Sequence, residues 1–303
     1  METQITLRDE LHSLIEMVIN SVQSPATRRA YSAALRDFLA WYLPNREQGL
    51  NKAAVQAYVT YLQGQKTGGI NIRLAAIRKM ATEAEDNGLL DPALAEGIRR
   101  VKGIRQEGQR TGNWLTRSQA EKLINTPNVS TLKGLRDRAV LALLIGCGLR
   151  REELAGLTLE QIQQRDSRWV IANLVGKRNK TRTVPVPVWA KVALDAWTEK
   201  AGIAEGKAFR AMNRHGQIIG EDISAQGIRD LVVELSKQAG TPVAPHDLRR
   251  TFAKLARKAG AELTQIQLTL GHSSVQVTQR YIAEDQDLTD APGDRIRIHL
   301  AAD

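Results

Sequence analysis

The sequence predicts a mainly α-helical protein with a small antiparallel β-sheet, divided into two domains. Apolar side chains recur at helical spacing through most of the 303 residues. Two β-branched runs, 168–175 and 182–188, flank the turn-rich segment GKRNKT, a pattern typical of a β-hairpin. Residues 97–113 hold four glycines and five Arg or Lys residues with little apolar periodicity, so they are expected to link the two domains.

The first domain, residues 1–96, is expected to contain four helices. The apolar positions and the turn signals place them at 11–19, 25–44, 51–62 and 70–88. Pro44 ends the second helix, Gly68-Gly69 separates the third from the fourth, and Asn87-Gly88 ends the fourth. The apolar stripe of the second helix is interpreted as core; it consists of Tyr31, Leu35, Phe38 and Trp41.

The second domain is expected to span residues 114–285. Thr116 is a predicted N-cap, and the apolar segment 135–149 is a predicted central helix that stops at Gly146–Gly148. The hairpin follows, with Lys177 near its tip, and helical patterns resume at Trp189. A helix over 224–239 ends at Gly240, and two further helices, separated by Gly271, fill the segment from Pro245 to Tyr281.

The last segment, 286–303, is acidic and polar. Ile296, Ile298 and Leu300 alternate within it at the period of a strand. Two interpretations stay open: a short strand or arm that packs on a neighbouring protomer, and a frayed terminus.

The charge of the chain indicates a polyanionic partner. The net charge is +10 with a pI near 9.9, and residues 1–283 alone hold 41 basic against 27 acidic residues. A basic but merely solvated surface is the alternative. If the partner is DNA, the expected contacts come from the first domain and the linker: Arg28, Arg73, Arg78, Lys79, Arg99, Arg100 and Lys102.

Other features exclude several classes of protein. A single cysteine, Cys147, lies in an apolar run, which excludes disulfides and a zinc site of cysteines. The N-terminal segment has no signal-peptide pattern, and no run reaches the length of a membrane span. We therefore expect a cytoplasmic protein, associated with the nucleoid if it binds DNA.

Four residues of the segment from Pro245 to Tyr281 suggest chemistry on a phosphate. His246 and Arg249 are three apart and share one face of a helix, and His272 and Tyr281 follow. No acidic pair or cysteine ligands accompany them, so we expect no metal and no cofactor. Cationic donors can stabilise a pentacoordinate phosphate, and a phenol can attack it once its proton leaves.

Two earlier segments can complete this set. Arg150, in GLRREEL, can fork onto the phosphate oxygens, and Glu153 lies three residues later. Lys177 can supply the proton that a leaving 5′-hydroxyl needs. His246 is interpreted either as a base or as a hydrogen-bond donor to the phosphate.

The combined motifs resemble the tyrosine recombinases, the family of phage integrases and Xer resolvases. The matching pieces are GLRREEL, GKRNKTRTVPVP, HDLRRTFA, LGHSS and QRYI, and the helices TRRAYSAALRDFLAWY and INIRLAAIRKM extend the resemblance to the first domain. The resemblance implies a SAM-like core-binding domain and a catalytic domain that form a C-shaped clamp on duplex DNA. It assigns Arg150, Lys177, His246, Arg249 and His272 to the phosphate pocket, Tyr281 as nucleophile and Glu153 as support.

The same resemblance implies site-specific recombination without metal or ATP. Strands would be cut and rejoined through a 3′-phosphotyrosyl intermediate and a Holliday junction, in a homotetramer on two synapsed DNA sites. Accessory proteins or a second recombinase are possible partners. Two alternatives remain, namely a topoisomerase of the type IB class and a catalytically silent DNA-binding regulator. The DNA target, and the choice among integration, excision, resolution and inversion, do not follow from the sequence.

Overall fold

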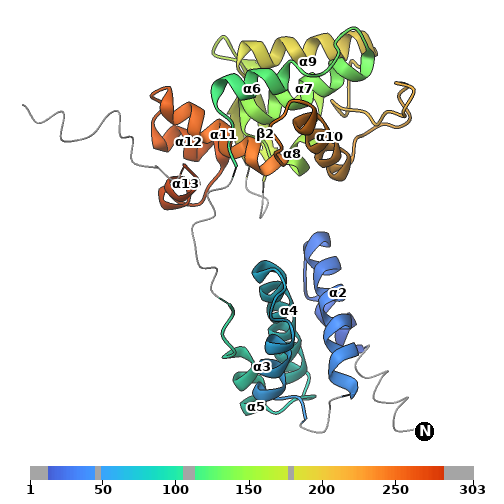
Figure 1. Ribbon diagram of the computed structural model, residues 1–303, viewed down its shortest axis with the longest axis vertical. Coiled ribbons are helices and arrows are strands. Elements are labelled where there is room, and N and C mark those ends of the chain that lie inside the picture. The colour runs from blue at the N-terminus through green and yellow to red at the C-terminus, as the bar shows by residue number, and fades with distance from the viewer. Residues whose placement is uncertain (1–12, 45–48, 105–112, 177–180, 283–303) are drawn as a thin grey trace, which may run out of the picture. The chain divides into compact units, whose positions relative to one another are not determined.

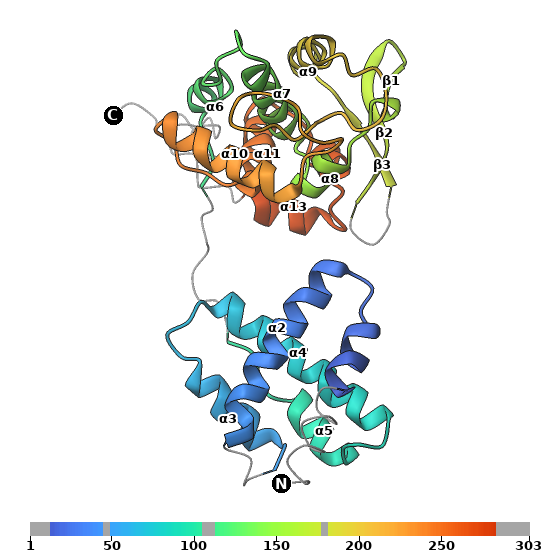
Figure 2. The same cartoon turned by 90° about the vertical axis from the view of Figure 1, so that its right-hand side faces the viewer.

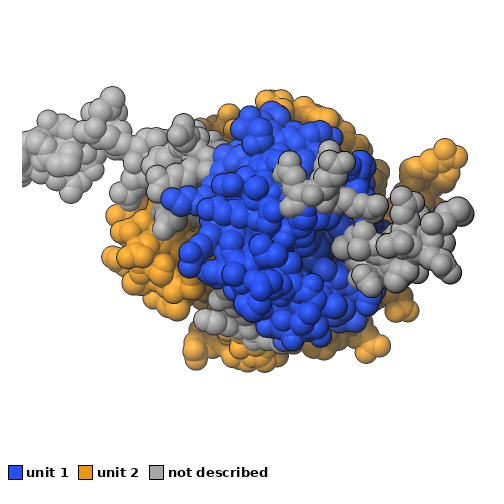
Figure 3. Space-filling view, turned by 90° about the horizontal axis from the view of Figure 1, so that it is seen from below, with its two compact units in different colours: residues 1–109 blue, residues 110–303 orange. Residues whose placement is uncertain are grey.

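The computed structural model describes residues 13–44, 49–104, 113–176 and 181–282. The chain forms two compact units, residues 1–109 and 110–303, which Figure 3 distinguishes by colour. Their boundary falls inside the segment expected to be a linker. Among the described helices, none combines the length and the apolar character that crossing a membrane would need. The predicted strand at 296–300 and the hairpin tip with Lys177 lie outside the described residues.

Unit 1 is helical throughout its described residues (Figures 1 and 2). Residues 13–20 are helical, and the elements that follow are α2 (Pro25–Tyr42), α3 (Lys52–Tyr61), α4 (Thr67–Asp86) and α5 (Pro92–Arg99). The Ser24 hydroxyl caps α2, and the Asn51 side chain accepts from the Ala54 N–H at 3.0 Å to cap α3. The interior is apolar and aromatic, with Leu35, Phe38, Tyr58, Ile77 and Met80 all buried.

Unit 1 differs from the sequence prediction at the start of α4 and in the presence of a helix after α4. Helix α4 begins at Thr67, so Gly68 and Gly69 lie in its first turn instead of before it. The first turn tolerates glycine because its N–H groups have no partner inside the helix. Residues 92–99, part of which was assigned to the linker, form α5, because Asp91 caps the helix and Ile98 is buried.

The segment after α5 is also tied to unit 1. Val101 is buried, and its carbonyl accepts from Arg78. Asn71 of α4 makes two hydrogen bonds with the backbone of Ile104, at 2.9 and 3.0 Å. Residues up to 104 are therefore attached to unit 1 by contacts of their own, seven residues past the predicted start of the linker.

Unit 2 combines helices with one small sheet, which confirms the predicted fold class. Its helices are α6 (Arg117–Ile124), α7 (Leu132–Cys147), α8 (Arg151–Gly156), α9 (Val188–Ala201), α10 (Ala225–Gln238), α11 (Pro245–Lys258), α12 (Leu263–Leu270) and α13 (Val275–Ile282). Thr116 caps α6 as predicted, in a reciprocal pair with Gln119.

The sheet has three antiparallel strands in the order β1 (Ile162–Arg165), β2 (Arg168–Val175) and β3 (Thr181–Pro185). Figure 2 shows them at one edge of unit 2. Ile171 pairs with Ile162 on one side and with Val184 on the other. Sequence reasoning missed β1, because IQQR is short and polar and carries no β-branched run.

Helix α7 forms the centre of unit 2. Its side chains are buried on nearly every face, and α9 runs alongside it (Figure 1). Trp197 of α9 is fully buried and its indole N–H donates to the Ala208 carbonyl at 2.9 Å. Helix α11 packs on α7 from another side through Leu248. A rigid core therefore lies directly behind the ends of α7 and α11.

Two glycines in the left-handed conformation end α7 and α9, and they provide a test of local packing. Gly148 has φ 60° and Gly202 has φ 65°. A Cβ on Gly148 would lie 2.6 Å from Phe252 and 2.9 Å from Leu270, whereas a Cβ on Gly202 would meet nothing within 4 Å.

We expect Gly202→Ala to lower the free energy of unfolding by about 1 kcal/mol, the cost of a side chain in left-handed backbone. Gly148→Ala should lower it by a further 1–3 kcal/mol or so, because overpacking adds to that cost. Chemical denaturation followed by tryptophan fluorescence measures both. Equal losses in the two variants would contradict the packing explanation.

Candidate active site

Arg150 stands where the chain leaves the central helix. The left-handed Gly148 turns the backbone, and Arg150 becomes the N-cap residue of α8. Its backbone N–H donates to one carboxylate oxygen of Glu153 at 2.9 Å, and its guanidinium Nη1 donates to the other at 2.7 Å. Glu153 therefore fixes both the backbone and the side chain of Arg150.

Glu153 is also held from the sheet. It is 7% exposed, and Arg182 of β3 donates to its two oxygens at 2.9 and 2.8 Å. Burial alone would raise the pKa of Glu153, but the hydrogen bonds from Arg182 and from the Arg150 backbone outweigh it and lower the pKa to about 2. The carboxylate is thus ionised at any physiological pH and accepts hydrogen bonds from two arginines.

Arg182 was not assigned a role by sequence reasoning, although it lies in the quoted motif GKRNKTRTVPVP. Its Nε donates to the Thr269 carbonyl near the end of α12 at 2.8 Å, so it joins β3, α8 and α12. The alternation of the strand was the available sequence signal, because Arg182 is two residues before Val184 and so shares a face with it. The structure shows Val184 buried and Thr181 and Thr183 exposed.

Arg249 is the most deeply buried cation of the site, at 1% exposed. It lies on α11 and donates to the carbonyls of Gly148 and Leu270, at the C-terminal ends of α7 and α12. The last carbonyls of a helix lack partners within the helix and carry partial negative charge. These two helix ends therefore neutralise part of the charge of Arg249 and orient its guanidinium.

His246 begins the same helix, one turn before Arg249 and just after Pro245. Its ring reaches the surface, and its pKa is lowered by partial burial and then by the positive charges of Arg250 and Arg249. The imidazole is therefore mostly neutral near pH 7, a state in which it can accept a proton.

His272 follows the left-handed Gly271 that ends α12. Its backbone N–H donates to the Gln267 carbonyl at 3.1 Å, and its ring Nδ1 lies 3.0 Å from the hydroxyl of Thr278. Burial, followed by the charges of Arg249 and Arg150, lowers the pKa of His272 to about 4. This imidazole is neutral as well.

Two adjoining hollows bring these residues together, because Arg150 lines both of them. One, of about 430 Å³, is also lined by Arg182 and His272; the other, of about 320 Å³, is also lined by His246 and Arg249. Arg150 is therefore shared by the hollow that contains His272 and the hollow that contains His246. Within the described ranges, no three His, Cys, Asp or Glu residues cluster as a metal site requires.

Two residues of the predicted set cannot be placed by their side chains. Lys177 lies outside the described residues. Tyr281 belongs to α13, nine residues after His272, but its side chain is also outside what the structure describes. Helix α13 itself is docked, since Thr278 is fully buried and Ile282 packs with Ile266 and Leu270.

The cations expected to contact DNA from unit 1 have varied surroundings. Arg28, Arg100 and Lys102 are exposed. Several have partners within the unit: Arg78 donates to the Val101 carbonyl, Lys79 pairs with Glu83 at 2.6 Å, Arg99 pairs with Glu85 and Glu96, and Arg100 pairs with Glu96 at 2.8 Å. Such pairs compete with phosphate for the cation, so these contacts stay a prediction.

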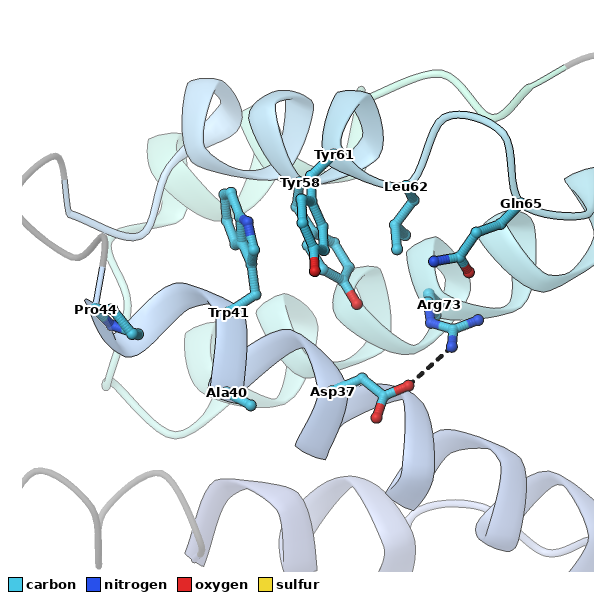
Figure 4. Close-up of a pocket in the computed structure, with 9 residues that line it drawn as sticks. All are labelled: Asp37, Ala40, Trp41, Pro44, Tyr58, Tyr61, Leu62, Gln65 and Arg73. Atoms are coloured by element: carbon cyan, nitrogen blue, oxygen red, sulfur yellow. Dashed lines mark hydrogen bonds and ion pairs between the residues drawn. The ribbon is translucent and has the colours of Figure 1, made fainter.

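Arg73 lies in a hollow of about 490 Å³ between α2, α3 and α4 (Figure 4). It pairs with Asp37 at 2.8 Å and faces Trp41, Tyr58 and Tyr61, whose rings contact one another. The sequence predicted the stripe around Trp41 as core, and Trp41 is in fact only partly buried at the rim of this hollow.

Comparison with curated proteins gives relatives over most of the chain. Tyrosine recombinase XerD of Pseudomonas aeruginosa is 30% identical over 84% of this chain and 85% of its own length. Tyrosine recombinase XerC of Myxococcus xanthus is 33% identical, over 85% of this chain and 87% of its own length.

Solved structures share the fold at lower identity. A lambda integrase dimer bound to a COC′ core site matches 98% of this chain and 80% of its own, with a TM-score of 0.71 and 17% identity. The XerH site-specific recombinase bound to palindromic difH substrate matches 86% of this chain and 76% of its own, with a TM-score of 0.68 and 18% identity.

The model of the phage integrase family matches residues 113–287, which include every lining residue of the two hollows that share Arg150. The identity to the recombinases of Pseudomonas and Myxococcus extends the match into unit 1. This chain therefore belongs to the phage integrase family, that of the tyrosine recombinases.

Proposed function

We propose that this tyrosine recombinase cuts and rejoins DNA by an attack of Tyr281 on a backbone phosphate bound between Arg150, Arg249 and His272. Site-specific DNA recombination is the activity of its family; the residues and steps are the proposal. The observation that carries it is the pair of hollows that share Arg150, with a neutral histidine in each.

The arginines supply the charge that the reaction needs. A phosphate under attack spreads additional negative charge over its non-bridging oxygens. A planar guanidinium can donate two parallel hydrogen bonds to such oxygens. Glu153, itself held by Arg182, holds Arg150, and two helix-end carbonyls hold Arg249, so neither side chain needs to reorganise when DNA binds. This preorganisation is where most of the rate enhancement is expected to arise.

The proposed cleavage step exchanges one bond at phosphorus and moves two protons. The Tyr281 oxygen forms a bond to phosphorus while the bond to the 5′-oxygen of the next nucleotide breaks. His246 accepts the phenol proton, and Lys177 gives a proton to the leaving 5′-oxygen, which becomes a 5′-hydroxyl. The product is a 3′-phosphotyrosyl link, which keeps the phosphoester so that another 5′-hydroxyl can reverse the step without ATP.

The proposed partners are two DNA recombination sites and four copies of the chain, joined through a Holliday junction. The solved relatives named above are bound to their DNA sites, one of them as a dimer, which supports multimeric assembly on DNA. A clamp formed by the two units, and the need for accessory proteins or a second recombinase, stay predictions. The target site can be found by trapping covalent adducts on DNA that flanks the gene.

Substitution of the nucleophile gives the most direct test. Tyr281→Phe should reduce covalent adduct formation on a nicked duplex of the mapped site by about 10⁴-fold or more, because no other phenol replaces the attacking oxygen. Tyr31→Phe, in α2, is the matched control and should leave the rate unchanged. An unchanged adduct in Tyr281→Phe would refute the assignment.

A plasmid with two copies of the mapped site separates recombination from its enzymatic alternative. We expect deletion or inversion products that depend on both sites, which agarose gels resolve. Relaxation of plasmids irrespective of the site, without such products, would favour a type IB topoisomerase. DNA binding without any adduct would favour a silent regulator.

Arg182→Met should lower the free energy of unfolding, because it removes a partner of the buried Glu153 carboxylate. At pH 7 the variant should unfold about 3 kcal/mol more readily, because a buried carboxylate loses one of its partners. In the native protein the low pKa of Glu153 means that its contribution is complete above about pH 4.5 and is lost only towards pH 2. In the variant that pKa rises, and a deficit of about 3 kcal/mol corresponds to a rise of about two. The deficit should therefore shrink as the pH falls from about 5 towards 2.

Urea denaturation at several pH values measures this deficit, with Arg168→Met on the exposed face of β2 as control. Adduct formation at pH 7 should fall in Arg182→Met and not in Arg168→Met. A deficit that is independent of pH would show that Arg182 does not keep Glu153 ionised.

A further inference from the structure

Thr278 is a buried hydroxyl that the proposed reaction does not yet use. It lies on α13, one turn before Tyr281, and is 0% exposed. Its Oγ1 lies 3.0 Å from Nδ1 of His272, which belongs to the turn before α13. A side chain of the helix that carries Tyr281 thus contacts a ring of the phosphate pocket.

The partner of Thr278 is unusual for a helical threonine. Such hydroxyls commonly donate to a carbonyl of the preceding turn. Thr269 follows this habit with the Gln265 carbonyl at 2.8 Å, and Thr251 does so with the Asp247 carbonyl at 2.9 Å. The hydroxyl of Thr278 instead makes a hydrogen bond with an imidazole, where it can act as donor or as acceptor.

The direction of this hydrogen bond decides what His272 can do. With its lowered pKa the ring is neutral and carries one N–H. If Nδ1 held the proton, Nε2 would present a lone pair, which repels a phosphate oxygen. If Thr278 donates to Nδ1, the proton lies on Nε2 and the ring can donate to phosphate.

The backbone and the ring of His272 are held by different helices. Gln267 of α12 accepts from the His272 N–H at 3.1 Å and donates to its carbonyl at 3.2 Å. The ring is held by α13, which is docked through Thr278 and Ile282. A shift of α13 would therefore release the ring and leave the backbone of His272 in place.

We propose that Thr278 is a positioning residue: it donates to Nδ1 of His272, keeps the proton on Nε2 and makes this arrangement depend on the docking of α13. The inference rests on the proposed function, because it assigns His272 as a donor to the scissile phosphate. It couples activation of the phosphate to the position of the helix that carries Tyr281. A protomer with a displaced α13 would lose its nucleophile and one phosphate donor together.

The tautomer can be measured without DNA. Two- and three-bond ¹⁵N–¹H correlations of the full chain, labelled at histidine, report which ring nitrogen carries the proton, and His272→Gln assigns the signal. We expect the Nε2–H form in the native protein at pH 7.5 and a mixed population in Thr278→Val, which keeps the shape of the side chain and removes the hydroxyl. A native His272 with its proton on Nδ1 would overturn the proposal.

The kinetic consequence is tested with the nicked duplex described above. At saturating DNA, Thr278→Val should slow adduct formation by about 10- to 100-fold, the size of effect that a mispositioned donor produces, while binding changes by less than about twofold. Thr278→Ser keeps the hydroxyl and should stay within about threefold of the native rate. Thr264→Val, which removes a hydroxyl at an exposed position of α12, is the control.

Equal rates for the native protein and Thr278→Val would refute the coupling. A thermal midpoint for each variant identifies misfolding, and the native tautomer still decides the proposal if Thr278→Val does not fold. Failure of the proposed function itself is distinguishable, since it would appear as adducts in Tyr281→Phe, whereas the NMR result for His272 does not depend on that residue.

Discussion

The buried carboxylate of Glu153 is the interaction on which the rest of the site depends. It accepts from the Arg150 backbone, the Arg150 side chain and both terminal nitrogens of Arg182, so one charge joins two segments that are distant in the sequence. Arg182 joins a third segment, α12, through the Thr269 carbonyl. Burial of a single carboxylate is unfavourable, and burial of a single guanidinium is too; together they satisfy each other. The sheet, α8 and α12 are thereby fixed relative to one another before any substrate arrives.

A second constraint comes from the ends of helices. Gly148 and Gly271 end α7 and α12 in the left-handed conformation, and the carbonyls of Gly148 and Leu270 converge on Arg249. At Gly271 a Cβ would lie 3.0 Å from the Arg182 side chain. The absence of a side chain at Gly271 therefore also makes room for Arg182, which binds Glu153. The two glycines thus serve the site through the neighbours they admit as well as through their backbone conformation.

Sequence reasoning predicted the fold class and most helices, because apolar periodicity and caps such as Thr116 are local signals. It also selected Arg150, Glu153, His246, Arg249 and His272, which the structure brings together. It missed α5, whose few apolar residues are buried by contacts with α4 and α3, and it missed Arg182. The role of Arg182 depends on its facing Glu153 across 29 residues of sequence, a relation that pairing in the folded chain determines. The functions of Lys177 and of the tail stay predictions.

The division of labour among the cations follows from electrostatics. Arg150, Arg182 and Arg249 supply the positive charge, and each has a carboxylate or helix-end carbonyls as partner. Burial, and then repulsion by the neighbouring arginines, lowers the pKa of both histidines, which is why they are neutral near pH 7. Neutral rings can accept or donate a proton, a task that arginine cannot perform. Because a neutral ring has only one N–H, its usefulness then depends on which nitrogen bears it, and a buried hydroxyl such as that of Thr278 can make that choice.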